Sequence, residues 1–180
     1  MKSPIVVALV AGLLAGCTGG NQPAPQSAAP AGPSPKAYAN LAQVMRGIPF
    51  PASNLIFDTQ SNDPAAKPAE GSGSSGATAS FSGVYGGWQA VENAALAISE
   101  TANLITIPGR LCQNGRPVPL DRADFQKFAQ GLADAGQAAL KAAQSKNLDA
   151  MVEVSGTVSD ACAACHEVYR DKENDKDRCM

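Results

Sequence analysis

Apolar residues recur at three- and four-residue spacing along most of the second half of the chain, which is the pattern of amphipathic helices. The clearest stripe lies in residues 148–169, and another occupies 122–146, with Asp121 as a candidate N-cap. A third covers about 84–105, and a shorter, less regular stripe covers about 38–48. No segment competes with these as a strand. The pattern therefore predicts four helices and no sheet.

The segments between the stripes indicate how the helices are connected. Pro49 and Pro51 fall where the first stripe would continue, so we expect this helix to break or kink there, with residues 53–58 continuing it. Residues 59–83 are rich in Gly, Ser, Ala and Asp and predict a long crossing. A tight connection at 145–147 makes the last two helices antiparallel. The expected fold is all-α, an antiparallel four-helix bundle.

The N-terminus predicts export rather than a membrane span. Lys2 precedes an apolar run over residues 5–15, which is far shorter than the roughly 20 residues that a spanning helix needs. The run ends in Leu-Ala-Gly-Cys, which resembles a bacterial lipobox. This resemblance implies that residues 1–16 are a signal peptide, that a mature chain of 164 residues (180 minus 16) remains, and that lipid on Cys17 anchors it to the membrane. The alternative is a soluble exported protein in which Cys17 has no such role.

Composition divides the rest of the chain. Residues 17–34 are dominated by Ala, Pro, Gly, Gln and Ser, and predict a flexible linker between the lipid anchor and the domain. The bundle is expected over residues 35–172, and residues 173–180 are expected to be a charged C-terminal tail. The formal charge is −2, aromatic residues make up 5% and no basic stripe is present, so nothing favours nucleic-acid binding.

The strongest chemical signal is a Cys-Ala-Ala-Cys-His motif near the end of the last predicted helix, formed by Cys162, Cys165, His166 and the two alanines between the cysteines. C-x-x-C-H attaches haem, because residues at i, i+3 and i+4 share one helix face. The two thiols can add across the haem vinyl groups while the imidazole ligates the iron. Zinc fits less well, since the chain has one His and no second C-x-x-C. A thioredoxin-like pair would follow a strand, and none is predicted. We therefore expect one covalent haem c.

The sequence resembles the class II c-type cytochromes, which include cytochrome c prime and the low-spin cytochrome c-556 proteins. The resemblance rests on Cys-Ala-Ala-Cys-His-Glu-Val-Tyr-Arg at 162–170, on Val-Met-Arg-Gly-Ile at 44–48 and on Trp88, and it covers roughly residues 36–172. Class I cytochromes carry the attachment motif near the N-terminus instead. The resemblance implies a four-helix bundle with covalent haem c, and pairing of two bundles into a homodimer in some members.

The sixth position on the iron separates two functions. Met151 lies about 22 Å along the same helix from His166, which is out of reach, and Met180 ends a charged tail. Met45 is expected level with His166, and the resemblance also places the ligand of Met-ligated members on the first helix. With Met45 bound, a six-coordinate haem would carry single electrons between redox partner proteins at the periplasmic membrane surface. With Met45 as packing, a five-coordinate haem like that of cytochrome c prime would bind NO or CO.

An enzyme is not expected, because the chain lacks a second His for a triad or proton relay and we identify no distal acid or base. Cys112 and Cys179 remain after the lipid and haem cysteines are assigned, and an even pair in an oxidising compartment favours a disulfide. The alternative is two free thiols, but the bundle topology brings both to one end. Arg46 and Arg170 are candidates for contacts with haem propionates, with an exposed charge on a solvated face as the alternative for each.

Overall fold

The computed structural model describes residues 34–66 and 86–179, so the predicted signal peptide, Cys17 and most of the long crossing lie outside the described residues. Residues 35–180 form one compact unit. Its helices, from the N-terminus, are α1 (Leu41–Gly47), α2 (Pro49–Asp58), α3 (Gly87–Ile105), α4 (Ala123–Ser145), α5 (Leu148–Tyr169) and the short 3-10 helix η2 (Asp175–Asp177).

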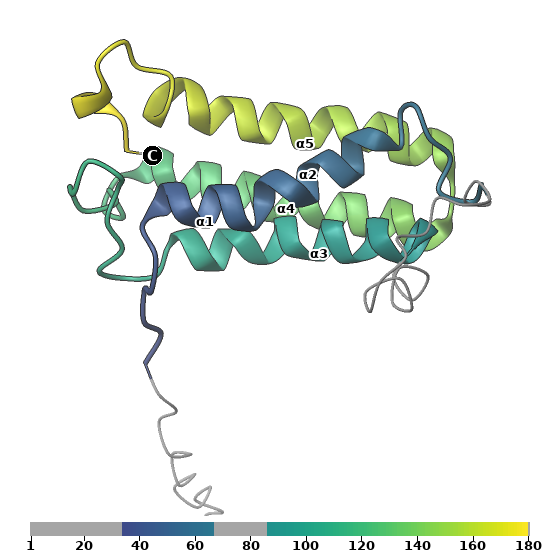
Figure 1. Cartoon of the computed structure of the whole chain (residues 1–180), viewed down its shortest axis with the longest axis horizontal. Coiled ribbons are helices and arrows are strands. Elements are labelled where there is room, and N and C mark those ends of the chain that lie inside the picture. The colour runs from purple at the N-terminus through teal and green to yellow at the C-terminus, as the bar shows by residue number, and fades with distance from the viewer. Residues whose placement is uncertain (1–33, 67–85, 180) are drawn as a thin grey trace, which may run out of the picture. The chain divides into compact units, whose positions relative to one another are not determined.

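The helices pack side by side as a bundle in which α1 and α2 follow one another along a single leg (Figure 1). This leg contacts α3, α3 contacts α4, and α4 contacts α5, with α2 closing the bundle against α5. Among the described residues there is no strand, and the extended pairing is one isolated bridge between Leu111 and Pro117. The structure therefore confirms the all-α four-helix bundle. None of the described helices is long and apolar enough to cross a membrane.

The first leg breaks where the prolines predicted, but it resumes earlier than expected. Helix α1 ends at Gly47 and α2 begins at Pro49, with Ile48 between them. Pro49 and Pro51 occupy the first turn of α2, where a missing backbone N–H removes no helical hydrogen bond. The second piece therefore starts at residue 49 rather than 53.

The expected cap of α4 is wrong. Helix α4 begins at Ala123 with Arg122 at the N-cap position, while Asp121 still lies in the preceding turn. Asp124 is the acidic residue of the first turn, and its Oδ1 accepts a hydrogen bond from the backbone N–H of Phe125 at 2.9 Å. A carboxylate here also suits the positive end of the helix dipole.

A glycine sets the close packing of α3 against α4. A Cβ added at Gly136 would lie 2.5 Å from the backbone nitrogen of Ser99. We expect Gly136→Ala to push the helices apart and to lower the free energy of unfolding by about 1–3 kcal/mol. Gly131 on the same helix has no neighbour within 4 Å of such a Cβ, so Gly131→Ala should raise it by about 0.5–1 kcal/mol. Urea denaturation of both variants checks the pair, and equal effects of the same sign would contradict the packing argument.

Candidate haem site

A cavity of about 610 Å³ lies where the last turns of α5 face the first leg of the bundle. Its lining combines the C-x-x-C-H residues with apolar side chains from α1, α2 and α4 and with charged side chains at the end of α5 and beyond. The lining includes Ala42, Met45, Arg46, Phe50, Phe57, Gln113, Phe128, Leu132, Cys162, Cys165, His166, Glu167, Arg170, Asp171 and Arg178. Two segments far apart in the sequence, α1 and the C-terminal tail, therefore contribute to one cavity.

The three residues of the haem motif are presented by one unbroken helix. Helix α5 starts with Asn147 as N-cap, whose side-chain oxygen accepts a hydrogen bond from the backbone N–H of Ala150 at 3.0 Å, and it continues to Tyr169. Cys162, Cys165 and His166 are each partly buried and all line the cavity. The regular helix therefore holds two thiols and an imidazole on one side, as the spacing predicted.

Burial shifts the pKa values of these three groups toward their neutral forms. Burial raises the pKa of the Cys165 thiol to about 11 and also raises the pKa of Cys162, so both sulfurs are protonated near neutral pH. Burial and the nearby Arg170 lower the pKa of His166, which favours the neutral imidazole that ligates iron. In the part of the chain that the structure describes, no three Cys, His, Asp or Glu side chains are arranged to hold a metal ion by themselves.

The structure brings Met45 and His166 to the same cavity from α1 and α5. Met45 is partly buried and packs against the apolar cluster at this end of the bundle, which includes Leu41 and Ile105. Met151 is fully buried in the other apolar cluster and does not line the cavity. The contrast between the two methionines agrees with their expected levels in the bundle.

Both predicted arginines line the cavity, and a third joins them. Arg46 and Arg170 are exposed, and Arg170 forms an ion pair with Asp171 at 2.6 Å. Arg178 is the residue that the sequence analysis missed. Its neighbour Cys179 was predicted to pair with Cys112, and this pairing is the signal that would have placed Arg178 near the end of α5.

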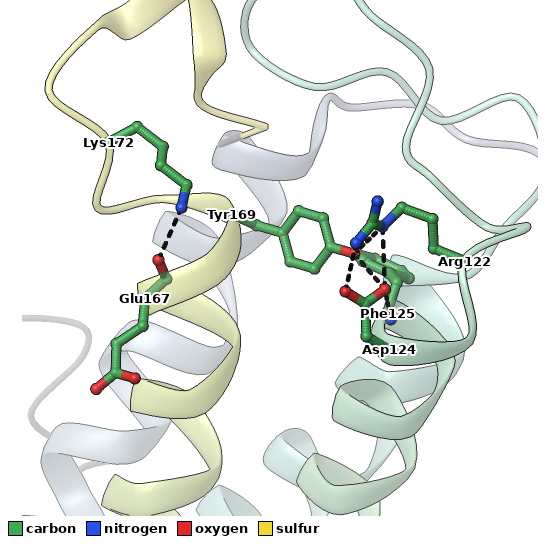
Figure 2. A network of polar contacts seen from close by, with 6 residues as sticks. All are labelled: Arg122, Asp124, Phe125, Glu167, Tyr169 and Lys172. Atoms are coloured by element: carbon green, nitrogen blue, oxygen red, sulfur yellow. Dashed lines mark hydrogen bonds and ion pairs between the residues drawn. The ribbon is translucent and has the colours of Figure 1, made fainter.

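Tyr169 secures the end of α5 to the start of α4, as Figure 2 shows. Its hydroxyl donates a hydrogen bond to Asp124 Oδ1 at 2.8 Å and accepts one from Arg122 Nε at 2.9 Å. These contacts lower the pKa of Asp124, with the Arg122 hydrogen bond as the largest cause. The Tyr169 ring also packs edge-on against Phe125 and Phe128, with ring centroids 5.4 and 6.3 Å away. Because Phe128 lines the cavity, this network fixes one wall of it.

A disulfide joins Cys112 and Cys179 with an S–S distance of 1.99 Å, and both residues are buried. It links the loop between α3 and α4 to the tail after α5. The structure thus brings these two cysteines together and leaves Cys162 and Cys165 as free thiols at the cavity. The predicted disulfide is therefore confirmed, and the two cysteines of the motif are left unpaired.

The residues present fit a covalently attached haem c. A haem needs two thiols and an axial imidazole on one side, an apolar space for its ring, and cationic or polar groups for its carboxylates. In this cavity, α5 supplies the two thiols and the imidazole. Phe50, Phe57 and Leu132 supply an apolar surface for the ring, and the arginines supply cationic groups for the carboxylates.

Comparison with known proteins supports the same assignment. The family model described as Cytochrome C' matches residues 118–170, which contain α4, α5 and the whole haem motif. This match, over the last two helices of the bundle, supports a class II c-type cytochrome, and the matched family binds covalently attached haem c, the cofactor predicted from the sequence. No curated protein and no solved structure matches the chain.

Proposed function

We propose that this protein is an electron carrier in which His166 and Met45 are the two axial ligands of haem iron. The observation that carries the proposal is that these two side chains, from α5 and α1, line one cavity. Bound haem c supplies an iron that takes up and releases one electron. A carrier of this kind needs a site that keeps its ligands as the electron arrives and leaves.

The chain's own residues suit that requirement. The lowered pKa of His166 keeps its imidazole neutral, and the thioether of Met45 is neutral at any pH, so neither ligand must lose a proton. Phe50, Phe57 and Leu132 make the cavity largely apolar around them. An apolar surrounding and an axial Met both favour a relatively high reduction potential.

The alternative is a five-coordinate haem protein that binds NO or CO. The observation that favours it is the same apolar lining, because Ala42 and Phe50, which line the cavity together with Met45, give a small uncharged gas molecule a suitable surface. In this case Met45 would be a packing residue, as its contacts with the apolar cluster also allow.

Met45→Leu distinguishes the two functions. If Met45 is a ligand, the wild-type holoprotein shows a far-red Met-to-ferric band and no spectral change with CO, whereas Met45→Leu loses the band and binds CO. Met151→Leu is the matched control, since it removes a thioether of equal size that is fully buried away from the cavity. Visible spectra of the oxidised and reduced proteins, with and without CO, give the answer. A wild-type protein that binds CO as readily as Met45→Leu would contradict ligation.

The proposed carrier is exported to the periplasm and exchanges electrons with redox partner proteins at the membrane surface, with no catalytic step of its own. The lipobox-like segment ending at Cys17 supports attachment through lipid. We expect Cys17→Ser to move the haem protein from the membrane fraction to the soluble periplasmic fraction, as measured by haem staining of both fractions. Retention of Cys17→Ser in the membrane would contradict a lipid anchor.

A further inference from the structure

Besides residues of α1, α2 and α3, a loop residue and the C-terminal tail reach the haem cavity from outside the family match. The match covers residues 118–170, yet Gln113 before it and Asp171 and Arg178 after it all line the cavity. The tail after α5 turns back toward the bundle, where Cys179 is buried and disulfide-bonded. The α3–α4 loop and the tail after α5 therefore contribute to the cavity together with the helices.

The tail is held in place by a covalent bond and several hydrogen bonds. The Cys112–Cys179 disulfide ties it to the α3–α4 loop. The backbone N–H of Cys179 donates to the carbonyl of Tyr169 at 2.8 Å, and the Asn114 side chain donates to the carbonyl of Lys176 at 2.9 Å. Arg178 Nε donates to the carbonyl of Lys172 at 2.7 Å, which fixes the course of its side chain.

Arg178 determines the sign of the net charge around the cavity. The cavity is lined by three arginines, Arg46, Arg170 and Arg178, and by two acidic residues, Glu167 and Asp171. The net charge of these five side chains is therefore +1. Without Arg178 the sum would be zero. A positive charge near the haem stabilises the reduced form, which carries one more electron. At a separation of about 10 Å and an effective dielectric constant of about 20–80, one such charge changes the ratio of reduced to oxidised protein by roughly two- to fifteenfold.

We propose that the disulfide-clamped tail is a wall of the haem cavity and that Arg178, held there by the Cys112–Cys179 bond, favours the reduced protein. Arg178 acts through its positive charge. Its guanidinium group can also bind the carboxylates of haem. The proposal rests on the proposed function in that electrons are exchanged at this cavity, but it does not require Met45 to be a ligand.

The first test compares Arg178→Gln with Arg178→Lys and Arg116→Gln. Arg116 is an exposed arginine of the α3–α4 loop that does not line the cavity, so its replacement removes the same net charge away from the site.

At one fixed ambient potential near the wild-type midpoint, we expect Arg178→Gln to lower the ratio of reduced to oxidised holoprotein about three- to tenfold. A tenfold fall corresponds to 59 mV for one electron. Arg178→Lys and Arg116→Gln should stay within about twofold of wild type. Equal effects of Arg178→Gln and Arg116→Gln would overturn the proposal.

The second test asks whether the disulfide acts through Arg178. We expect the double variant Cys112→Ser, Cys179→Ser to lower the same ratio by a similar factor, and Arg178→Gln to add nothing in that background. A full Arg178→Gln effect without the disulfide would overturn the role of the clamp. If the clampless variant fails to fold, the arginine series still decides the role of Arg178. Failure of the proposed Met45 ligation appears separately, as CO binding by the wild-type protein.

Discussion

Replacing both Cys162 and Cys165 with serine is expected to abolish covalent haem completely. The hydroxyl of serine does not form the thioether that a cysteine thiol forms with a haem vinyl group. Among the described cysteines these two line the cavity, whereas Cys112 and Cys179 are consumed in the disulfide. Each single variant should retain haem through one bond, so the double variant alone should lose it fully.

The measurement is haem staining after denaturing electrophoresis, together with the intact mass of the purified chain. Ala163→Ser is the matched control, because it places a serine between the same two cysteines at an exposed position and leaves both thiols intact. It should keep one haem per chain. Covalent haem in the double serine variant would contradict the assignment of the motif, and its loss in Ala163→Ser would show that serine disturbs the helix itself.

The parts of the site predicted well from sequence are those set by local geometry. Cys162, Cys165 and His166 depend on the spacing of side chains along one helix, which follows from helical pitch. The tight connection before α5 is equally local, since Lys146 takes the left-handed conformation and Asn147 caps the next helix. Neither feature requires knowledge of what packs against it.

Features that depend on distant segments were predicted less well. Asp121 was expected to cap α4, but Arg122 and Asp124 instead bond to Tyr169 at the end of α5, a contact that no local pattern indicates. The position of Arg178 at the cavity was missed for a similar reason. Its run of alternating charges is typical of a solvated tail, and its place at the cavity depends on the return of the chain to Cys112.

Removing the disulfide should give the largest loss of stability among the substitutions considered. The bond joins residues 67 apart in the sequence, and a cross-link over a loop of this length restricts the unfolded chain by about 4 kcal/mol in the chain-entropy model. Both cysteines are also buried members of the apolar cluster that contains Tyr169 and Phe125. We therefore expect the double variant Cys112→Ser, Cys179→Ser to lose about 4 kcal/mol in free energy of unfolding while keeping its covalent haem.

Urea denaturation followed by circular dichroism measures this loss, and a thiol reductant separates cross-linking from packing. When its disulfide is reduced, the wild-type protein should lose most of the free energy of unfolding that the double variant loses. The double variant has no such bond, so its response to the reductant reports the effect of reducing the haem iron alone and serves as the correction. If the corrected loss in wild type is near zero while the double variant is strongly destabilised, the stabilisation comes from packing of the buried sulfurs. If the corrected loss in reduced wild type equals the loss in the double variant, the stabilisation comes from the cross-link itself.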